Sequence, residues 1–162
     1  MSEAEFELVC GKFKELAIAF QVLEHVEVRT SEDAARVRGS KPRNGVKALL
    51  VKAKRKDKEF FVLVDIRADK LLDWKKLRKA LQVNEVRFAP LEEVPLQTGC
   101  EAGGVPPFGF LKKMAIIVDP SVFDEKIVEF NAGLKTKSVR LSSKDLRKVF
   151  DSIGVAYFNV VE

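Results

Sequence analysis

The sequence has few of the residues that most often carry enzyme chemistry. Among its 162 residues there is a single histidine, His25, and there are two cysteines, Cys10 and Cys100. One histidine without a Gly-x-Ser-x-Gly motif offers no catalytic triad, so a structural or exposed histidine is the simpler interpretation. The cysteines lie far apart and match no metal-ligand spacing. A structural disulfide is the alternative to the reducing, cytosolic setting that we expect, and for Cys100 we expect a buried neutral thiol.

Long apolar runs and known phosphate-binding motifs are also absent. No apolar run approaches 18 residues, so the sequence predicts no membrane span. The first residues include Glu3, Glu5 and Glu7 instead of a basic segment followed by an apolar one, which does not match a signal peptide. We therefore expect a cytoplasmic protein. No glycine-rich stretch continues into Gly-Lys-Ser/Thr or has the spacing of a dinucleotide fingerprint.

The overall composition is that of a globular protein with a moderate basic surplus. Apolar residues make up 46% and charged residues 33% of the chain, and its length fits one domain over residues 1–162. Twelve phenylalanines, beside one Trp and one Tyr, predict a core rich in Phe. The net charge of +5 favours a polyanionic partner such as RNA, although many basic proteins bind no nucleic acid.

Apolar periodicity and capping residues predict a mixture of helices and strands. Helices are expected over 5–21, 31–38 (capped by Thr30 or Ser31), 74–81 (capped by Asp73) and 143–150 (capped by Ser142 or Ser143), with a helical turn over 91–96. Strands are expected over 25–29, 46–54, 60–66, 86–89, 115–118, 127–130, 138–141 and 155–161. We expect two hairpins, one formed by 46–54 and 60–66 and the other by 127–130 and 138–141. The pattern indicates an α+β fold, with a mixed, mostly antiparallel sheet or partial barrel surrounded by helices.

Lys47 opens an otherwise apolar strand, where alternation places it on one face with Leu49 and Val51. A lysine that shares a face with core residues needs an anionic partner, because burying an unpaired charge costs several kcal/mol. The alternative is an edge position from which the side chain reaches water. The sequence leaves both interpretations open.

The segment 98–109, TGCEAGGVPPFG, holds four of the nine glycines and two of the six prolines. Glycine allows positive φ and close approach of a ligand, whereas proline fixes the backbone. This composition predicts a slim, shaped loop whose N–H groups can face a carbonyl or a phosphate. A tight turn packed on the core would use the same residues. Cys100 lies beside the loop, but no neighbouring base supports a nucleophilic role.

Several ordered segments together resemble the YbaK/ProX family of aminoacyl-tRNA deacylases, the free-standing relatives of the editing domain of bacterial prolyl-tRNA synthetase. The matching segments are 18–20 (IAF), 30–35 (TSEDAA), 46–51 (VKALLV), 98–109 with the family's Gly-x-x-x-Pro on Gly103 and Pro107, and 131–133 (NAG). The resemblance implies the fold above and a trans-acting aminoacyl-tRNA hydrolase. The alternative is a non-catalytic module of the same fold that binds tRNA or docks onto a synthetase.

By this resemblance, Lys47 holds a phosphate or the ribose of the terminal adenosine. The N–H groups of Gly103 and Gly104 orient the aminoacyl carbonyl and stabilise the developing oxyanion. Water is the nucleophile, assisted by the tRNA's own 2′-hydroxyl. The expected partners are the tRNA 3′ end and an aminoacyl-tRNA synthetase, with no cofactor, metal or membrane.

The resemblance places the amino-acid pocket around a further set of residues, namely His25, Thr30, Val105, Pro107, Asn131, Gly133 and Ser138. His25 stands where bacterial cysteinyl-tRNA deacylases carry a tyrosine, and Ser138 where they carry an aspartate. These departures leave the amino acid open within a small class of Ala, Ser, Cys or Pro. Small pockets distinguish one methylene by only about 1–3 kcal/mol, so such a site works by excluding larger side chains.

Overall fold

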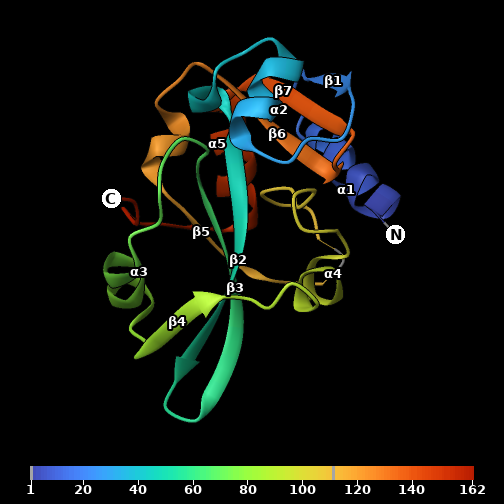
Figure 1. The fold of residues 1–162 in the computed structure, drawn as a ribbon. Helices are drawn as coiled ribbons and strands as arrows, with labels where there is room; N and C mark the ends of the chain where they lie inside the picture. The colour runs from blue at the N-terminus through green and yellow to red at the C-terminus, as the bar shows by residue number, and fades with distance from the viewer. Residues whose placement is uncertain (1, 111) are drawn as a thin grey trace.

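The computed structural model describes residues 2–110 and 112–162, which form two open β-sheets with helices packed around them (Figure 1). The helices are α1 (Ser2–Glu15), α2 (Ser31–Arg38), α3 (Trp74–Leu81), α4 (Glu93–Thr98) and α5 (Ser143–Ile153). The strands are β1 (Gln21–Glu24), β2 (Val46–Arg55), β3 (Lys58–Arg67), β4 (Glu85–Phe88), β5 (Ala115–Val118), β6 (Ile127–Leu134), β7 (Lys137–Ser142) and β8 (Ala156–Tyr157).

The larger sheet is built on the long hairpin of β2 and β3, which runs through the middle of the molecule (Figure 1). Its strand order is β4-β2-β3-β5-β8, where β4 is antiparallel to β2 while β5 and β8 run parallel to their neighbours. The second sheet has the order β1-β7-β6 and is antiparallel throughout. The expected α+β fold with a mixed, mostly antiparallel sheet is confirmed, and neither sheet closes into a barrel.

Phenylalanine fills the core between the three-stranded sheet, α1 and α5, as the composition predicts. Phe108 is 1% exposed and lies edge-on to the rings of Phe13, Phe130 and Phe150, with ring centroids 5.5, 5.9 and 6.3 Å away. Such edge-to-face pairs add to the free energy of burial. Because Phe108 belongs to the glycine- and proline-rich loop, this packing anchors the loop to the core.

Local capping chemistry sets the starts of three helices. The side chains of Thr30, Asp73 and Ser142 each accept a hydrogen bond, at 3.0 to 3.1 Å, from the backbone N–H three residues later. Gly39 ends α2 in the left-handed conformation with φ of 72°. These caps confirm the predicted starts, and they resolve the choice between neighbouring residues in favour of Thr30 and Ser142.

The expected first helix, the strand over 25–29 and the last strand differ most from the observed elements. The first helix ends at Glu15, because Ala17 takes a positive φ of 56° that breaks the helix. The strand expected over 25–29 is wrong: pairing with β7 involves Gln21–Glu24, and beyond His25 the chain turns toward α2. Of the segment 155–161, only Ala156–Tyr157 forms a strand, since Val160 N–H donates to the Asp119 side chain instead of a ladder. None of the helices in the described residues is long and apolar enough to cross a membrane.

Candidate functional site

A cavity of about 270 Å³ lies at the beginning of β2, where α2, the glycine loop and β6 converge. Five of the residues predicted for the site line it, namely Thr30, Lys47, Gly103, Val105 and Asn131. These residues come from four separate segments of the sequence, and the fold brings the segments together. A larger hollow of about 830 Å³ lies between α1 and residues 108–110 and 112–116, but none of the predicted site residues lines it.

Lys47 lies on the cavity wall with its ammonium group partly removed from water. Its neighbours on the same face, Leu49 and Val51, belong to a cluster that includes Ile66, as strand alternation predicts. Burial lowers the pKa of Lys47, and the carboxylate of Asp69 opposes this by raising it. Within residues 2–110 and 112–162 the ammonium forms no ion pair, so the cavity wall presents a cation that is half-buried and unpaired.

The edge of β2 at the cavity is unpaired backbone. On the side away from β3, β4 pairs only with residues 51–54, and Gly45 forms an isolated bridge to Glu129. Between these contacts, the backbone of residues 46–49 has no partner strand in the described chain, and these four residues line the cavity. Unpaired strand edges offer both N–H donors and C=O acceptors to a ligand.

The glycine loop faces this edge, and its two central glycines have different environments. Gly103 is exposed, with φ of 92°, a conformation that favours glycine. Gly104 is buried: its N–H donates to the Glu101 carbonyl at 2.9 Å, and its carbonyl accepts from Gly133 N–H at 2.8 Å. In this conformation the Gly104 N–H closes a turn, so it is engaged where the sequence predicts a donor to the substrate. Gly103 is the loop glycine that lines the cavity.

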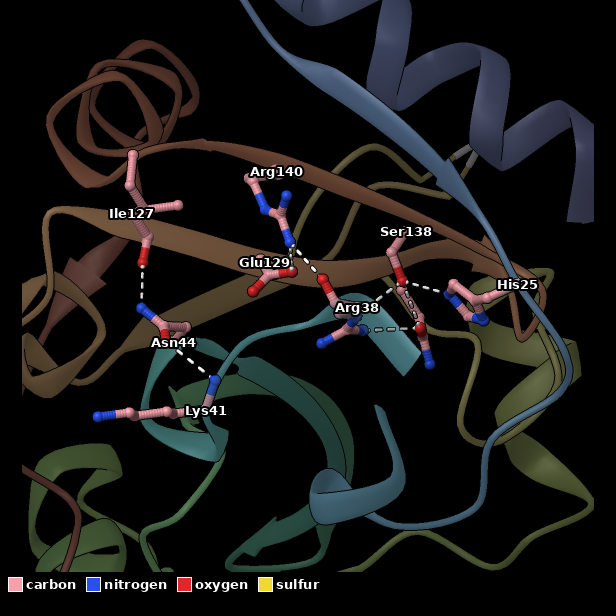
Figure 2. Close-up of polar contacts among 9 residues, drawn as sticks. His25, Arg38, Lys41, Asn44, Ile127, Glu129, Ser138 and Arg140 are labelled. Carbon is pink, nitrogen blue, oxygen red and sulfur yellow. Dashed lines mark hydrogen bonds and ion pairs between the residues drawn. The ribbon is translucent and has the colours of Figure 1, made fainter. Parts of the chain in front are cut away.

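Asn131 connects the loop to the second sheet through its side-chain amide. Its Nδ2 donates to the Gly103 carbonyl at 2.6 Å, and its Oδ1 accepts from Arg38 Nη2 at 2.8 Å. Arg38 also donates from Nε to Ser138 Oγ at 2.9 Å, and this hydroxyl lies 3.1 Å from Asn131 Oδ1. His25 Nε2 completes the group at 2.7 Å from Ser138 Oγ, and Figure 2 shows His25 and Arg38 converging on Ser138.

The hydrogen bonds of His25 fix the direction of this network. Nδ1 lies 2.7 Å from the Val26 carbonyl, which only accepts, so Nδ1 carries a proton. In the neutral ring Nε2 is then an acceptor, and the Ser138 hydroxyl donates to it. The Ser138 hydroxyl therefore links His25 to the group that holds the glycine loop.

An ion pair between Glu129 and Arg140 holds the backbone of Arg38 (Figure 2). Glu129 is 1% exposed, and its Oε2 accepts from Arg140 Nη2 at 3.0 Å. Arg140 Nη2 also donates to the backbone carbonyl of Arg38 at 2.7 Å. Burial lowers the pKa of Arg38, while the Glu129 carboxylate raises it and the Arg140 guanidinium lowers it. Glu129 therefore supplies the negative charge beside two arginines.

The remaining predicted residues lie behind the cavity wall. Pro107, Gly133 and Ser138 are buried, and His25 is half-buried. Sequence reasoning missed Arg38, Glu129 and Arg140. Strand alternation was the available signal, because it places Glu129 and Asn131 on the same face of β6.

Cys100 is a buried neutral thiol, as expected. It is 0% exposed, and burial is the main cause that raises its pKa to about 12. Its Sγ donates weakly to the Thr98 carbonyl at 3.6 Å. A thiol with such a pKa is a poor nucleophile at neutral pH, and both cysteines are free and buried. No group of three or more His, Cys, Asp or Glu side chains that could hold a metal ion occurs among the described residues.

Comparisons with known proteins identify the family. A model of the aminoacyl-tRNA editing domain matches residues 25–149. The multifunctional Ser/Thr-tRNA deacylase ProXp-y of Escherichia coli (strain K12) is 33% identical over 131 residues, which are 80% of this chain and 78% of that protein. The proline--tRNA ligase of Bacillus licheniformis is 36% identical over 95 residues, which are 59% of this chain and 16% of the ligase.

Among solved structures, a candidate trans-editing enzyme for prolyl tRNA synthetase has a TM-score of 0.78 at 22% identity, covering 98% of this chain and 97% of that one. This match shows the likeness of the fold. The family model spans most of the chain and includes the strand of Lys47, the glycine loop and Asn131. The resemblance seen in the sequence is thereby confirmed, and the chain belongs to the aminoacyl-tRNA editing domain family.

Proposed function

We propose that this protein hydrolyses, in trans, the ester bond between a wrongly attached small amino acid and the 3′-terminal ribose of a tRNA. The observation that carries the proposal is the cavity itself, in which the half-buried ammonium of Lys47 lies on the strand facing Gly103. Family membership supports the reaction class. The chain, taken over residues 1–162, acts as one editing unit in the cytoplasm.

Lys47 binds and positions the nucleic-acid end of the substrate. An unpaired ammonium in a partly dry site gains most from an anionic ligand, because its desolvation cost is already met by the fold. A phosphate of the terminal nucleotides satisfies that cation, and its ribose then lies next to the β2 edge. Lys47 positions the substrate and is not the nucleophile. Loss of Lys47 therefore misplaces the ester but does not remove the attacking group.

The glycine loop and the β2 edge act on the aminoacyl group. We assign the Gly103 N–H to the carbonyl oxygen of the ester, where charge develops in the tetrahedral intermediate. The Gly104 N–H donates to the Glu101 carbonyl and so closes the turn. To donate to the substrate, as the sequence predicts, this N–H would need a different loop conformation. Water attacks the carbonyl with help from the substrate's 2′-hydroxyl. This accounts for hydrolysis in a cavity that no Asp, Glu or His among the described residues lines.

The walls of the cavity favour a small amino acid. Ala34, Ala48 and Val105 line it, and the polar side chains of Thr30 and Asn131 stand beside them. The apolar walls exclude larger amino-acid side chains by shape. The few polar groups can form hydrogen bonds with a substrate side chain that carries a hydroxyl. The Ser/Thr specificity in the name of the Escherichia coli relative fits that chemistry. We propose Ala, Ser, Cys and Pro as the class, with His25 and Ser138 setting the choice indirectly through Asn131.

The test is a deacylation assay with a panel of tRNAs charged with Ala, Ser, Thr, Cys, Pro and a large control such as Phe. The expected result is faster hydrolysis of one or more small aminoacyl esters than of the Phe ester. Binding of tRNA without hydrolysis of any ester would favour the second candidate, a non-catalytic module that works with a synthetase. That module is suggested by the departures from related deacylases at His25 and Ser138 that the sequence resemblance implies.

A further inference from the structure

The positive charge of the chain is concentrated far from the cavity. Two segments, residues 52–59 and 73–88, together define what we call the basic arm. They contain ten Lys or Arg residues and four carboxylates, a surplus of six positive charges. The whole chain has a surplus of five, so acidic residues slightly outnumber basic ones in the remainder. Charged residues spread evenly over the surface would not place the whole positive surplus in two segments.

The two segments form one surface because their elements are bonded together. Arg55 Nη2 donates to the Leu81 carbonyl at 2.6 Å, which ties the hairpin to the end of α3. The strand β4 pairs with β2 from Val51 to Lys54, and Trp74 of α3 lies edge-on to Phe88 of β4 with ring centroids 4.8 Å apart. In Figure 1 the hairpin turn projects at the bottom of the molecule, next to β4.

Many of the charges on the arm are available to a partner. Lys56, Lys58, Lys75 and Lys79 are exposed and form no ion pair within the described residues, whereas Lys52 and Arg87 share Glu59 at 3.6 and 3.5 Å.

Exposed aromatic surface accompanies these charges. Phe88 is 54% exposed, and the guanidinium of Arg55 lies 5.2 Å from the ring centre of Phe60. Lysines with interspersed aromatic rings are typical of surfaces that bind nucleic acid.

We propose that the basic arm binds the phosphate backbone of the tRNA acceptor helix while the 3′ end occupies the cavity. The inference rests on the proposed function for the identity of the RNA. Both sites share one strand: Lys47 lies at the cavity end of β2, and Arg55 at the arm end. They lie eight positions apart along the strand, roughly 26 Å at 3.3 Å per residue. A single-stranded 3′ end spans that distance before the paired region begins.

Phosphate contacts of this kind have a defined signature. They strengthen binding of any acceptor helix without reading its sequence, and each adds about one unit to the slope of log K against log salt. They raise affinity equally in the ground state and the transition state, so their loss raises KM with little change in kcat. An acidic protein partner would not give an RNA-dependent effect.

The experiment compares the triple variant K56Q/K58Q/K79Q with K112Q/K113Q/K144Q, which removes three exposed lysines elsewhere. Each protein is assayed on an aminoacyl-tRNA and on the matching 2′(3′)-aminoacyl-adenosine, which ends short of the arm. The arm variant is expected to lower the ratio of kcat/KM on tRNA to kcat/KM on the adenosine ester by about 10- to 100-fold. The control variant keeps the wild-type ratio.

Unchanged ratios in both variants would overturn the inference and favour a protein partner on the arm. Equal losses in both variants would overturn it too, because they would show a general effect of net charge. If the wild type hydrolyses neither ester, the proposed function fails, and binding of uncharged tRNA then decides the arm separately. Weaker, less salt-dependent tRNA binding in the arm variant alone still supports it, and equal binding contradicts it.

Discussion

The side-chain amide of Asn131 donates a hydrogen bond of 2.6 Å to the backbone carbonyl of Gly103. This bond joins the second sheet to the exposed glycine of the loop, across 28 residues of sequence. A peptide group is planar, so a partner on the Gly103 carbonyl also fixes the orientation of the next N–H, that of Gly104. Asn131 therefore determines how the loop faces the cavity, without needing to contact the reacting atoms itself.

Replacing Asn131 with alanine is expected to lower kcat by about 10- to 100-fold, because a misplaced loop no longer holds the ester carbonyl in position. The affinity for uncharged tRNA is expected to stay near that of the wild type, since the arm and Lys47 are intact. Single-turnover deacylation measures the first quantity and fluorescence anisotropy the second. Thr136→Ala, an exposed position in the same hairpin, is the matched control. A wild-type kcat in Asn131→Ala would contradict the role of the loop anchor.

Arg38 is a positioning residue whose planar guanidinium serves two acceptors, Ser138 Oγ and Asn131 Oδ1. Arg38→Ala leaves both with fewer partners in a buried setting and is expected to cost about 1–3 kcal/mol in the free energy of unfolding. Lysine cannot span both acceptors in the same plane, so Arg38→Lys restores only part of this. Urea denaturation measures the effect.

The matched control is Arg36→Ala on the same helix, whose exposed ion pair with Asp33 contributes at most about 1 kcal/mol. A structural role alone would lower stability and leave kcat of deacylation unchanged under conditions where the variant is folded. The positioning role predicts that Arg38→Lys also lowers kcat, because Arg38 holds Asn131, which orients the glycine loop. A wild-type kcat for Arg38→Lys would argue against it.

Asp65 gives a prediction for stability against pH. It is 0% exposed, neither carboxylate oxygen has a hydrogen-bond partner in the described chain, and burial raises its pKa well above the usual range. In the unfolded chain it ionises near pH 4, so between that pH and its folded pKa the folded state holds one more proton. The free energy of unfolding contributed by this group therefore falls as pH rises, by up to about 1.4 kcal/mol per pH unit.

Asp65→Asn removes the titration while keeping the shape of the side chain. The difference in unfolding free energy between the variant and the wild type is expected to rise in favour of the variant as the pH increases above the unfolded pKa of about 4. Asp57→Asn, in the exposed turn of the β2–β3 hairpin, is expected to show no such trend. A difference that stays constant with pH for Asp65→Asn would rule out a buried carboxyl that titrates with folding.

Local sequence signals predict much of the fold, because they act through neighbouring residues. Thr30, Asp73 and Ser142 cap helices through bonds to residues only three positions away. The β2–β3 hairpin follows from two apolar strands around a charged turn. The strand expected over 25–29 fails because its extent depends on where its antiparallel partner β7 begins, which is not a local property.

The site is harder to predict from sequence for the same reason. Lys47 and the glycine loop are visible as unusual residues in their own segments. Arg38 is not, since it lies 93 and 100 residues from its partners Asn131 and Ser138. The direction of the Gly104 N–H is set by a turn with Glu101, and the residue types alone do not specify it. The family resemblance supplied the grouping of segments that residue patterns do not.

The most direct test of the account is the rate of ester hydrolysis by Lys47→Ala on the aminoacyl-tRNA that the wild type prefers. Lys144→Ala, an exposed lysine of α5, controls for the lost charge. The account predicts a loss of kcat/KM of at least about 100-fold for Lys47→Ala, because placing a reacting group correctly is worth that much or more, and little change for Lys144→Ala. Full activity of Lys47→Ala would contradict the claim that this half-buried cation holds the substrate.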